Sequence, residues 1–435
     1  MRLRRPAWPL VLLAAWCTGG PLLPQSSGEE PAAPVRVARL ITRLGSDAYA
    51  DREAAGAELV SLGPDARRQL EAASAHEDPE VRLRAKELLR RLREDDLWQA
   101  AKVDFQCRQV AAADVLAALS RQSGNRLLIG DEYGAFRDGG IDAEYTGTLF
   151  WEAVDDLCRR SGNRVRPHYD TRHPGLVVVS GLPGKYPVAY AGPVKMQINH
   201  ARRLFSEEFD YEQPRSERSH TFQLDLQAIW EDRFRLVAYR LQPEVVEAET
   251  DAGGRLSGQA TAGGWNIAGS GTKQVTMNIR LQPPPTSARS LKTLRLRWGL
   301  VAVGDLAQLD VDDLQSSAPH FQDDLELTIE SFQTAPGGRC ELTVLVAREA
   351  VPLDPAELVF QENEIELFDA QGRAYRKQGQ TNTLSDRGPL MKLSFSSENA
   401  ESVPRTLRVT YPRIRSQRDL EIVFRDVPLP VGRPE

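Results

Sequence analysis

Residues 293–298 read Thr-Leu-Arg-Leu-Arg-Trp, and residues 406–411 read Thr-Leu-Arg-Val-Thr-Tyr, so one six-residue pattern occurs twice in the chain. An acidic turn containing glycine precedes each copy, at 251–255 and at 369–373. Apolar and polar side chains alternate within each copy, which is the period of a β-strand. The recurrence predicts a duplicated β-rich unit of roughly a hundred residues.

The same alternation continues through most of the sequence after residue 186. Each copy offers about six to eight short strands separated by turn signals, a pattern typical of sheets packed face to face. We therefore predict two tandem Ig-like β-sandwiches, at 186–316 and 320–430, the second a repeat of the first. Polar residues at alternate positions fit sheets with one face in water.

Two shorter regions precede the sandwiches. Residues 35–98 have apolar positions at helical spacing, and residues 103–182 predict the order strand, helix, strand, strand, helix, strand, strand. The expected fold is multidomain: a short all-α helical repeat, a small α+β (βαββαββ) domain and two β-sandwiches. The expected inward helical positions are Val37, Leu40, Ile41, Leu44, Ala55, Leu59, Leu62, Ala66, Leu70, Ala73, Val81, Ala85, Leu88 and Leu92.

The helical region carries a short motif that is similar to a known repeat. Residues 78–82 read Asp-Pro-Glu-Val-Arg and are followed by Ala85 and Leu88. This wording resembles a HEAT-type repeat, in which the Asp caps a helix and the apolar spacing packs it on its partner. Stacks of such repeats generally need three or more units, so this short piece is expected to lean on the next domain or on a partner.

The region 103–182 resembles the secretin and TonB short N-terminal domain. The resemblance rests on 110–125 and 146–163, two helical stretches that each end in Ser-Gly-Asn, with 131–140 as an insertion. It implies a domain that docks on another protein of a channel or signalling assembly. No pore region of that family follows in this sequence, so the resemblance implies an adaptor. Similar strand-rich tandems with a short helical repeat occur in exported proteins of planctomycete-type bacteria.

The first residues indicate export. Arg2, Arg4 and Arg5 precede an apolar run at 10–16 that is too short to span a bilayer comfortably, as in a secretory signal peptide. We expect a signal peptide over 1–23 and a protein of the periplasm or cell surface.

The segment after the apolar run is expected to be a linker, since residues 24–34 are rich in Pro, Ser, Ala and Glu. Cys17 ends a run close to a lipobox, but Trp16 is large where a lipobox has a small residue. Membrane attachment is therefore expected only if Cys17 is lipidated.

The charge of the chain bears on its partners. The formal net charge is −6, and no basic tract with interleaved aromatic residues occurs, which argues against nucleic acid as a partner. An envelope protein is the expected partner, and the sequence leaves the oligomeric state open. We expect no cofactor, because no segment carries a recognisable binding motif.

Candidate metal ligands are few. His168, Asp170 and His173 lie within one predicted hairpin, but an odd separation places the two histidines on opposite faces of a strand, so a polar turn is the favoured interpretation. His200 and His220 are isolated in the sequence and are interpreted as surface or locally hydrogen-bonded residues.

Carboxylates gather at 310–313 and 323–324. Such loops can hold Ca²⁺, yet the spacing and the glycine of an EF-hand are missing. Solvated loop charge is the favoured interpretation, and no metal-site residue is assigned.

Three cysteines follow the signal region: Cys107, Cys158 and Cys340. Export permits disulfides, so Cys107 and Cys158, which share one predicted domain, have two alternatives. They form a bridge, or both are small buried hydrophobic residues.

No catalytic signature with a local motif occurs, whether G-x-S-x-G, HExxH, S-x-x-K or a phosphate loop. The glycines around Trp265 are interpreted as a hairpin loop, because strands flank them on both sides. We therefore predict a non-catalytic extracytoplasmic protein that mediates protein–protein interaction or envelope assembly, with no catalytic residues assigned. One alternative is a carbohydrate- or surface-polymer-binding protein that uses sandwich loops and Trp230, Trp265 or Trp298. Another is a hydrolase whose residues meet only in space.

Overall fold

The computed structural model describes residues 33–129, 140–168, 175–181, 184–212, 215–258, 264–269, 271–348 and 364–430. The chain divides into two compact units, residues 1–89 and 90–435. The expected signal peptide, Cys17 and most of the insertion at 131–140 lie outside the described residues. The described chain is mostly β, in several largely antiparallel sheets, with few helices.

Helices form the first unit, and the last of them continues into the second. Their bounds are α1 (Ala33–Arg43), α2 (Tyr49–Leu62), α3 (Pro64–Ala73) and α4 (Pro79–Trp98). Pro64 occupies the first turn of α3, where its missing N–H costs nothing. Asp78 caps α4 by accepting a hydrogen bond from the Glu80 backbone N–H at 2.8 Å. Local signals in the sequence therefore set these helix starts.

The inward helical positions expected from the sequence are buried, apart from Ile41 and Leu62, which are half-buried. Their burial explains why such short helices persist, since packing of an apolar face stabilises them more than propensity does. In the part of the chain that is described, no helix has the length and apolar content to cross a membrane.

The second unit starts with the end of α4 and a small α+β domain. Its elements are β1 (Lys102–Ala111), α5 (Ala112–Ser123), β2 (Leu127–Ile129), β3 (Gly140–Leu149), α6 (Phe150–Ser161), β4 (Asn163–His168) and β5 (Gly175–Ser180). The element order βαββαββ matches the sequence prediction. Gly124 and Gly162 end the two helices at φ 67° and 68°, the left-handed conformation that glycine adopts without strain. β1 pairs with β3, and β5 lies between β2 and β4.

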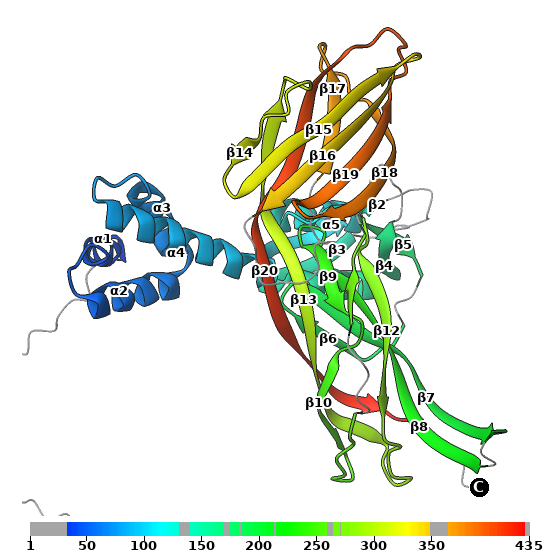
Figure 1. The fold of residues 1–435 in the computed structure, drawn as a ribbon. Helices are drawn as coiled ribbons and strands as arrows, with labels where there is room; N and C mark the ends of the chain where they lie inside the picture. Colours follow the sequence, from blue (N-terminus) through cyan, green and yellow to red (C-terminus); the bar gives the residue numbers. More distant parts are fainter. Residues whose placement is uncertain are drawn as a thin grey trace, which may run out of the picture. The chain divides into compact units, whose positions relative to one another are not determined.

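Three further sheets make up the rest of the second unit (Figure 1). The first outer sheet has the order β12-β8-β7-β6, and the second outer sheet has the order β14-β15-β16-β19-β18. The shared sheet runs β11-β9-β13-β20-β17, with β10 also paired to β13. Their bounds are β6 (Val188–Ala191), β7 (Val194–Asp210), β8 (Arg215–Trp230), β9 (Arg235–Arg240), β10 (Glu244–Thr250), β11 (Trp265–Ile267), β12 (Gln274–Leu281), β13 (Ser290–Val311), β14 (His320–Gln322), β15 (Leu325–Ala335), β16 (Arg339–Arg348), β17 (Glu364–Asp369), β18 (Arg376–Ser385), β19 (Gly388–Ser396) and β20 (Pro404–Pro428).

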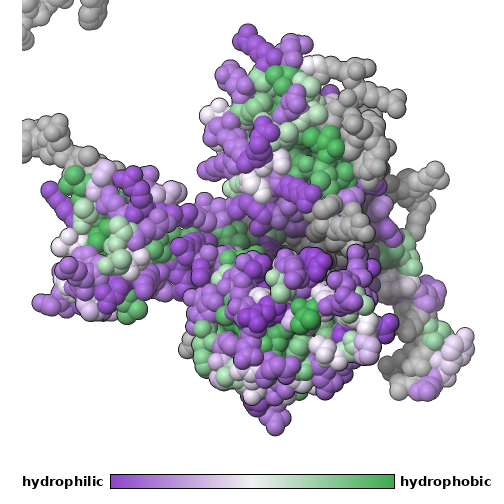
Figure 2. All heavy atoms as spheres, turned by 90° about the horizontal axis from the view of Figure 1, so that it is seen from above, coloured by the Kyte–Doolittle hydropathy of each residue, from purple (hydrophilic) through white to green (hydrophobic). Residues whose placement is uncertain are grey.

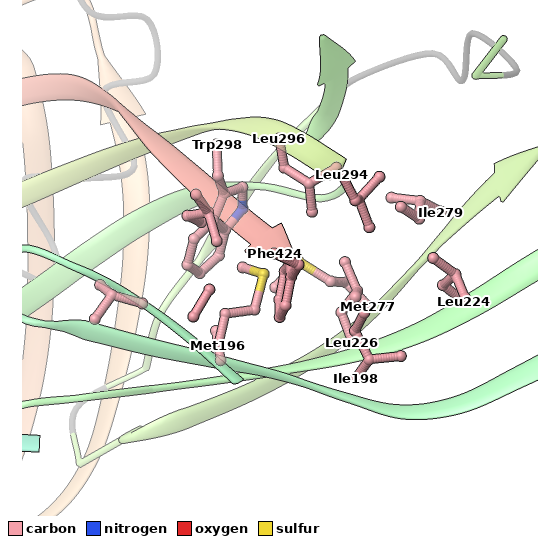
Figure 3. Close-up of a cluster of buried hydrophobic side chains, with 14 of the residues drawn as sticks. Met196, Ile198, Leu224, Leu226, Met277, Ile279, Leu294, Leu296, Trp298 and Phe424 are labelled. Atoms are coloured by element: carbon pink, nitrogen blue, oxygen red, sulfur yellow. The ribbon is translucent and has the colours of Figure 1, made fainter. Parts of the chain in front are cut away.

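The first core lies between the first outer sheet and the shared sheet. Trp298 is fully buried in it, and its indole N–H donates to the Arg240 carbonyl oxygen at 2.8 Å, so the polar edge of the ring is satisfied. Figure 3 shows side chains of both sheets pointing toward one another: Met196, Ile198, Leu224, Leu226, Met277, Ile279, Leu294, Leu296, Trp298 and Phe424.

The second core lies between the second outer sheet and the other part of the shared sheet. Tyr411, the counterpart of Trp298 in the sequence repeat, is fully buried there. Its hydroxyl donates to Asp323 Oδ2 at 2.7 Å. The two aromatic residues of the repeat therefore occupy separate cores, each with a hydrogen bond for its polar atom.

The two repeats meet in the shared sheet. β13 and β20 pair antiparallel over nearly their whole length, and Ala302 lies opposite Ser416 and Val303 opposite Arg415. Trp298 precedes Ala302 by four positions (302 − 298), as Tyr411 precedes Arg415 by four (415 − 411). The two copies of the pattern are therefore related by a local two-fold axis. The axis passes through the β13–β20 ladder between the pairs Ala302–Ser416 and Val303–Arg415.

Each long strand serves both cores. Val311 of β13 packs in the second core, and Phe424 of β20 packs in the first. This differs from the separate sandwiches expected at 186–316 and 320–430, because residues 420–429 of the second segment help to close the first core. The reason is strand length: β13 has 22 residues and β20 has 25, whereas ordinary strands have about 3–10.

The acidic turn is also duplicated in structure. The Thr250 N–H donates to the Gly254 carbonyl oxygen at 2.8 Å, and the Asp369 N–H donates to the Arg373 carbonyl oxygen at 3.0 Å. The structural counterpart of Asp369 is therefore Thr250, one residue before the Asp251 that the sequence comparison aligns with it. The shared geometry is a backbone turn, and the side chain that fills it differs.

The carboxylate of Asp369 should make stability depend on acidity. Burial raises the pKa of this group, but hydrogen bonds from the Arg373 backbone and guanidinium and from the Ser402 hydroxyl outweigh it and lower the pKa from 3.8 to about 2. A depressed carboxyl pKa stabilises the fold above about pH 4, and that contribution is lost as the pH falls toward 2. We expect Asp369→Asn to lower the urea midpoint at pH 7 and to match the wild type near pH 2, measured by circular dichroism.

The control for this prediction is the exposed Asp386, whose change to Asn should leave both midpoints unaltered. A difference between Asp369→Asn and the wild type that is equally large at pH 7 and pH 2 would contradict the prediction.

Candidate functional site

A two-stranded arm extends from the first outer sheet (Figure 1). β7 and β8 stay paired as far as Asp210 and Arg215. β6 pairs with β7 only up to Gln197, and β12 pairs with β8 only from Phe222 onward. We call residues 199–212 and 215–221 the arm, because no other described strand pairs with them there.

The arm carries exposed aromatic residues. Phe205 is 70% exposed, Phe209 is 50% exposed and Tyr211 is 89% exposed. Phe205 stacks on His220 at a centroid distance of 4.1 Å, and Phe209 contacts the edge of Tyr211 at 5.0 Å. We call Phe205, Phe209 and Tyr211 the aromatic cluster. On the face seen in Figure 2, hydrophobic residues lie in small areas among hydrophilic ones. Grouped exposed aromatics are typical of a binding surface.

Polar cross-strand contacts hold the arm together. Ser206 and Ser219 bring their hydroxyl oxygens to 2.6 Å, and the Arg218 Nε donates to Glu207 at 3.2 Å. The core begins only at Phe222, which is fully buried. The aromatic cluster therefore contributes little to folding, and exposed ladders of this kind rely on cross-strand pairs.

A buried polar network fixes the first outer sheet at the end of β8 that lies away from the arm. Glu231, directly after β8, is 0% exposed. It accepts hydrogen bonds from the Ala101 N–H at 2.9 Å, from Asn125 Nδ2 at 3.0 Å and from Arg233 Nε at 2.6 Å. Asn125 Oδ1 in turn accepts the Arg233 N–H at 3.1 Å. A buried carboxylate with three donors joins the α+β domain to the first outer sheet.

A second set of contacts spans the same junction. Asp155 on α6 accepts hydrogen bonds from the Tyr190 hydroxyl at 2.8 Å and from the Lys195 ammonium at 2.6 Å. The Trp151 indole N–H donates to the Pro193 carbonyl oxygen at 3.0 Å. Burial, together with the charge of Asp155, raises the pKa of Tyr190, which stays a hydrogen-bond donor at any physiological pH. These contacts therefore hold the α+β domain against the end of the first outer sheet that lies away from the arm.

The histidines considered as metal ligands do not form a site within the described residues. His168 ends β4, while Asp170 and His173 lie outside the described residues. Across the described ranges, no group of three or more His, Cys, Asp or Glu side chains is placed to hold a metal ion.

The carboxylates considered for calcium bind protein groups. Asp310 accepts two hydrogen bonds from Arg408, one from Nε and one from an Nη, each at 2.8 Å. This pairing lowers the pKa of Asp310. Asp312 accepts the Thr406 hydroxyl at 2.6 Å. Asp323 accepts hydrogen bonds from the second repeat, including Tyr411. These carboxylates therefore form hydrogen bonds that connect β13 and the segment after it to β20.

The three described cysteines are free thiols, so Cys107 and Cys158 do not form the bridge that the sequence left open. Cys158 is buried in the core of the α+β domain, as the other alternative has it, whereas Cys107 is half-buried and packs against that core. Burial raises the pKa of Cys158 to about 12 and that of Cys340 to about 11. A thiol that is protonated at neutral pH is a poor nucleophile.

The aromatics considered for a glycan are placed in different environments. Trp230 and Trp298 are 1% and 0% exposed, so neither reaches a surface ligand. Trp265 is half-buried, with the Arg240 guanidinium 4.9 Å from its ring centroid.

Sequence reasoning did not select the aromatic cluster. Its signal was present in residues 203–211, where apolar residues on both strand faces are interspersed with charges. A strand with neither face consistently apolar is one that no core covers.

Comparison of this chain with known proteins identifies no family. No protein-family model and no curated protein matches this chain. A solved structure described as "the conserved domain protein from Bacillus anthracis" is 10% identical, with a TM-score of 0.18, and the match covers 55% of this chain and 89% of that one. At that TM-score, the likeness carries no information on fold or function.

Proposed function

We propose that this chain is a non-catalytic exported protein that binds another protein through the arm. The observation that carries the proposal is the aromatic cluster on a strand pair whose outer edges are open among the described residues. Open strand edges recruit a further strand by main-chain hydrogen bonds, and exposed aromatic residues are the usual anchors of an interface.

The neighbouring regions fit an adaptor. We propose that residues 103–182 are a domain of the secretin and TonB short N-terminal type, supported by the order βαββαββ and by the two helices ending in Ser-Gly-Asn. We further propose that the helices at 35–98 are a HEAT-like repeat and that the layered sheets are Ig-like sandwiches. Export is supported by the basic and apolar residues at 2–16. In this proposal, the buried junction at Glu231 holds the α+β domain on the sheet from which the arm extends.

The proposal predicts that the aromatic cluster is needed for binding and not for folding. Phe205→Ser, Phe209→Ser and Tyr211→Ser together should leave thermal stability within about 0.5 kcal/mol per site, because the side chains are exposed. Partner binding should fall at least about tenfold, as for loss of interface anchors. The measurement is photo-crosslinking in intact cells from a benzoylphenylalanine at Tyr211, followed by mass spectrometry.

Phe321 on β14 provides the matched control, because it is also 70% exposed but lies in the other repeat. Crosslinking from position 321 should not capture the same protein, and Phe321→Ser should not weaken capture from the arm. Equal capture from both positions, or capture that survives loss of the aromatic cluster, would remove the proposal.

A further inference from the structure

The open edge of β7 has a self-complementary charge order. Residues 202–208 read Arg-Arg-Leu-Phe-Ser-Glu-Glu, so basic residues precede Phe205 and acidic residues follow it at equal distances. If two such strands lie antiparallel with Phe205 opposite Phe205, position 203 of each lies opposite position 207 of the other. Arg203 then meets Glu207 twice, once on each side of the two-fold axis.

We propose that the partner of the arm is a second copy of this chain, joined through antiparallel pairing of the two β7 edges centred on Phe205. This inference rests on the proposed function and names its partner. The closed symmetry matters, because a two-fold contact uses the same surface on both copies and covers the open β7 edge of each.

The side chains of the arm suit this arrangement. Arg203, Phe205 and Glu207 alternate along β7, so they lie on one face of the strand pair. Phe205 already stacks on His220 of β8, at an interplanar angle of 19°, which holds its ring over that face. In the dimer, the two phenylalanine rings meet at the axis between two pairs of opposite charge.

The charged residues have contacts that permit the pairing. The Nε of Arg203 is buried and has no hydrogen-bond partner among the residues that the structure describes. Glu207 is 53% exposed and contacts Arg218, which is 81% exposed. An ion pair between exposed side chains contributes little, so the contact with Arg218 competes only weakly with a contact to a second copy.

A strand of another protein could also pair with this edge. Such pairing would not require the charges of β7 to be arranged in opposite order on the two sides of Phe205. The inverted order about Phe205 is instead what self-recognition needs, because each Arg203 finds a carboxylate at the matching position. Charge complementarity therefore favours a second copy over an unrelated peptide.

The test is a charge exchange. We expect the wild-type chain to be a dimer by sedimentation equilibrium over about 1–100 µM, a range suited to a small interface. Arg203→Glu or Glu207→Arg alone places like charges opposite each other twice and should weaken the dimer at least about tenfold. The combination of both changes restores opposite charges and should recover most of the dimer.

A disulfide trap checks the register independently of these variants. Residues opposite each other in antiparallel strands have Cα atoms about 4.5–5.5 Å apart, within reach of a disulfide. Phe205→Cys should therefore oxidise to a covalent dimer, whereas Ser206→Cys, which faces position 204, should not. The native Cys158 and Cys340 are buried and do not compete.

A monomeric wild-type chain, a dimer unaffected by the single reversals, or a double variant that stays monomeric would each overturn the inference. The proposed function and this inference can be rejected independently of each other. If photo-crosslinking from position 211 captures a different protein while the purified chain is monomeric, the arm still binds a partner, and the second copy is excluded as that partner.

Discussion

Removal of residues 416–435 should unfold the first core and leave the second core folded, although these residues belong to the second sequence repeat. The deletion takes away Ile422, Phe424, Val427 and Leu429, all buried in the first core. Each such side chain contributes about 1.5–3 kcal/mol when buried. The summed loss approaches the whole stability of a domain, roughly 5–15 kcal/mol.

Tryptophan fluorescence provides a selective readout of this deletion. Trp230 and Trp298 are in the first core, and the sequence has no tryptophan after Trp298. We expect emission to shift to longer wavelength, while circular dichroism retains part of the β signal from the second core. That core keeps Leu407, Val409 and Tyr411, which lie before the cut.

A shorter deletion of residues 431–435 serves as the control, because it leaves Ile422, Phe424, Val427 and Leu429 in place. The shared-sheet description would be wrong if the longer deletion left tryptophan emission native and abolished only the second core.

Glu231→Ala should be the most destabilising single change at the junction between the α+β domain and the first outer sheet. It leaves the Ala101 N–H and Asn125 Nδ2 without the carboxylate that they bind, and Arg233 without its charge partner. Removing one member of a buried ionic network costs about 3–5 kcal/mol. Glu231→Gln keeps the shape and one acceptor oxygen, so its cost should be smaller.

Urea unfolding and hydrogen exchange test this expectation together. The Ala101 and Arg233 amides donate into the network and should lose protection in Glu231→Ala before the rest of the protein does. Glu330→Ala is the control, since Glu330 makes an ion pair with the exposed Arg387 and its loss should cost less than about 1 kcal/mol. Equal effects from the two substitutions would refute a special role for Glu231.

Much of the fold could be predicted because it depends on local patterns. Gly124 and Gly162 end helices for reasons visible in the sequence, and alternation revealed most of the strands. The length of β13 could not be predicted, since alternation does not say where one core ends and another begins. Val311 reads as an ordinary inward residue, and only its packing shows that it belongs to the second core.

The candidate site was less accessible to sequence reasoning. Isolated histidines and carboxylates were considered as metal ligands because of their chemistry. In the structure, however, Asp310 pairs with Arg408 on the neighbouring strand. Phe205 and Phe209 look like core residues by type. β6 and β12 stop short of the arm, and residues 203–211 do not reveal in the sequence where those other strands end.

The shared sheet also affects how the protein is made. A chain that emerges from the ribosome presents β13 well before β20, and strands β14 to β19 lie between the two in the sequence. The first core therefore stays open until residues 420–429 have emerged, while the second core can assemble from 306–412. Domains usually fold in the order of synthesis, the amino-terminal one first. Here the order should be reversed, and the half that is made first should be completed last.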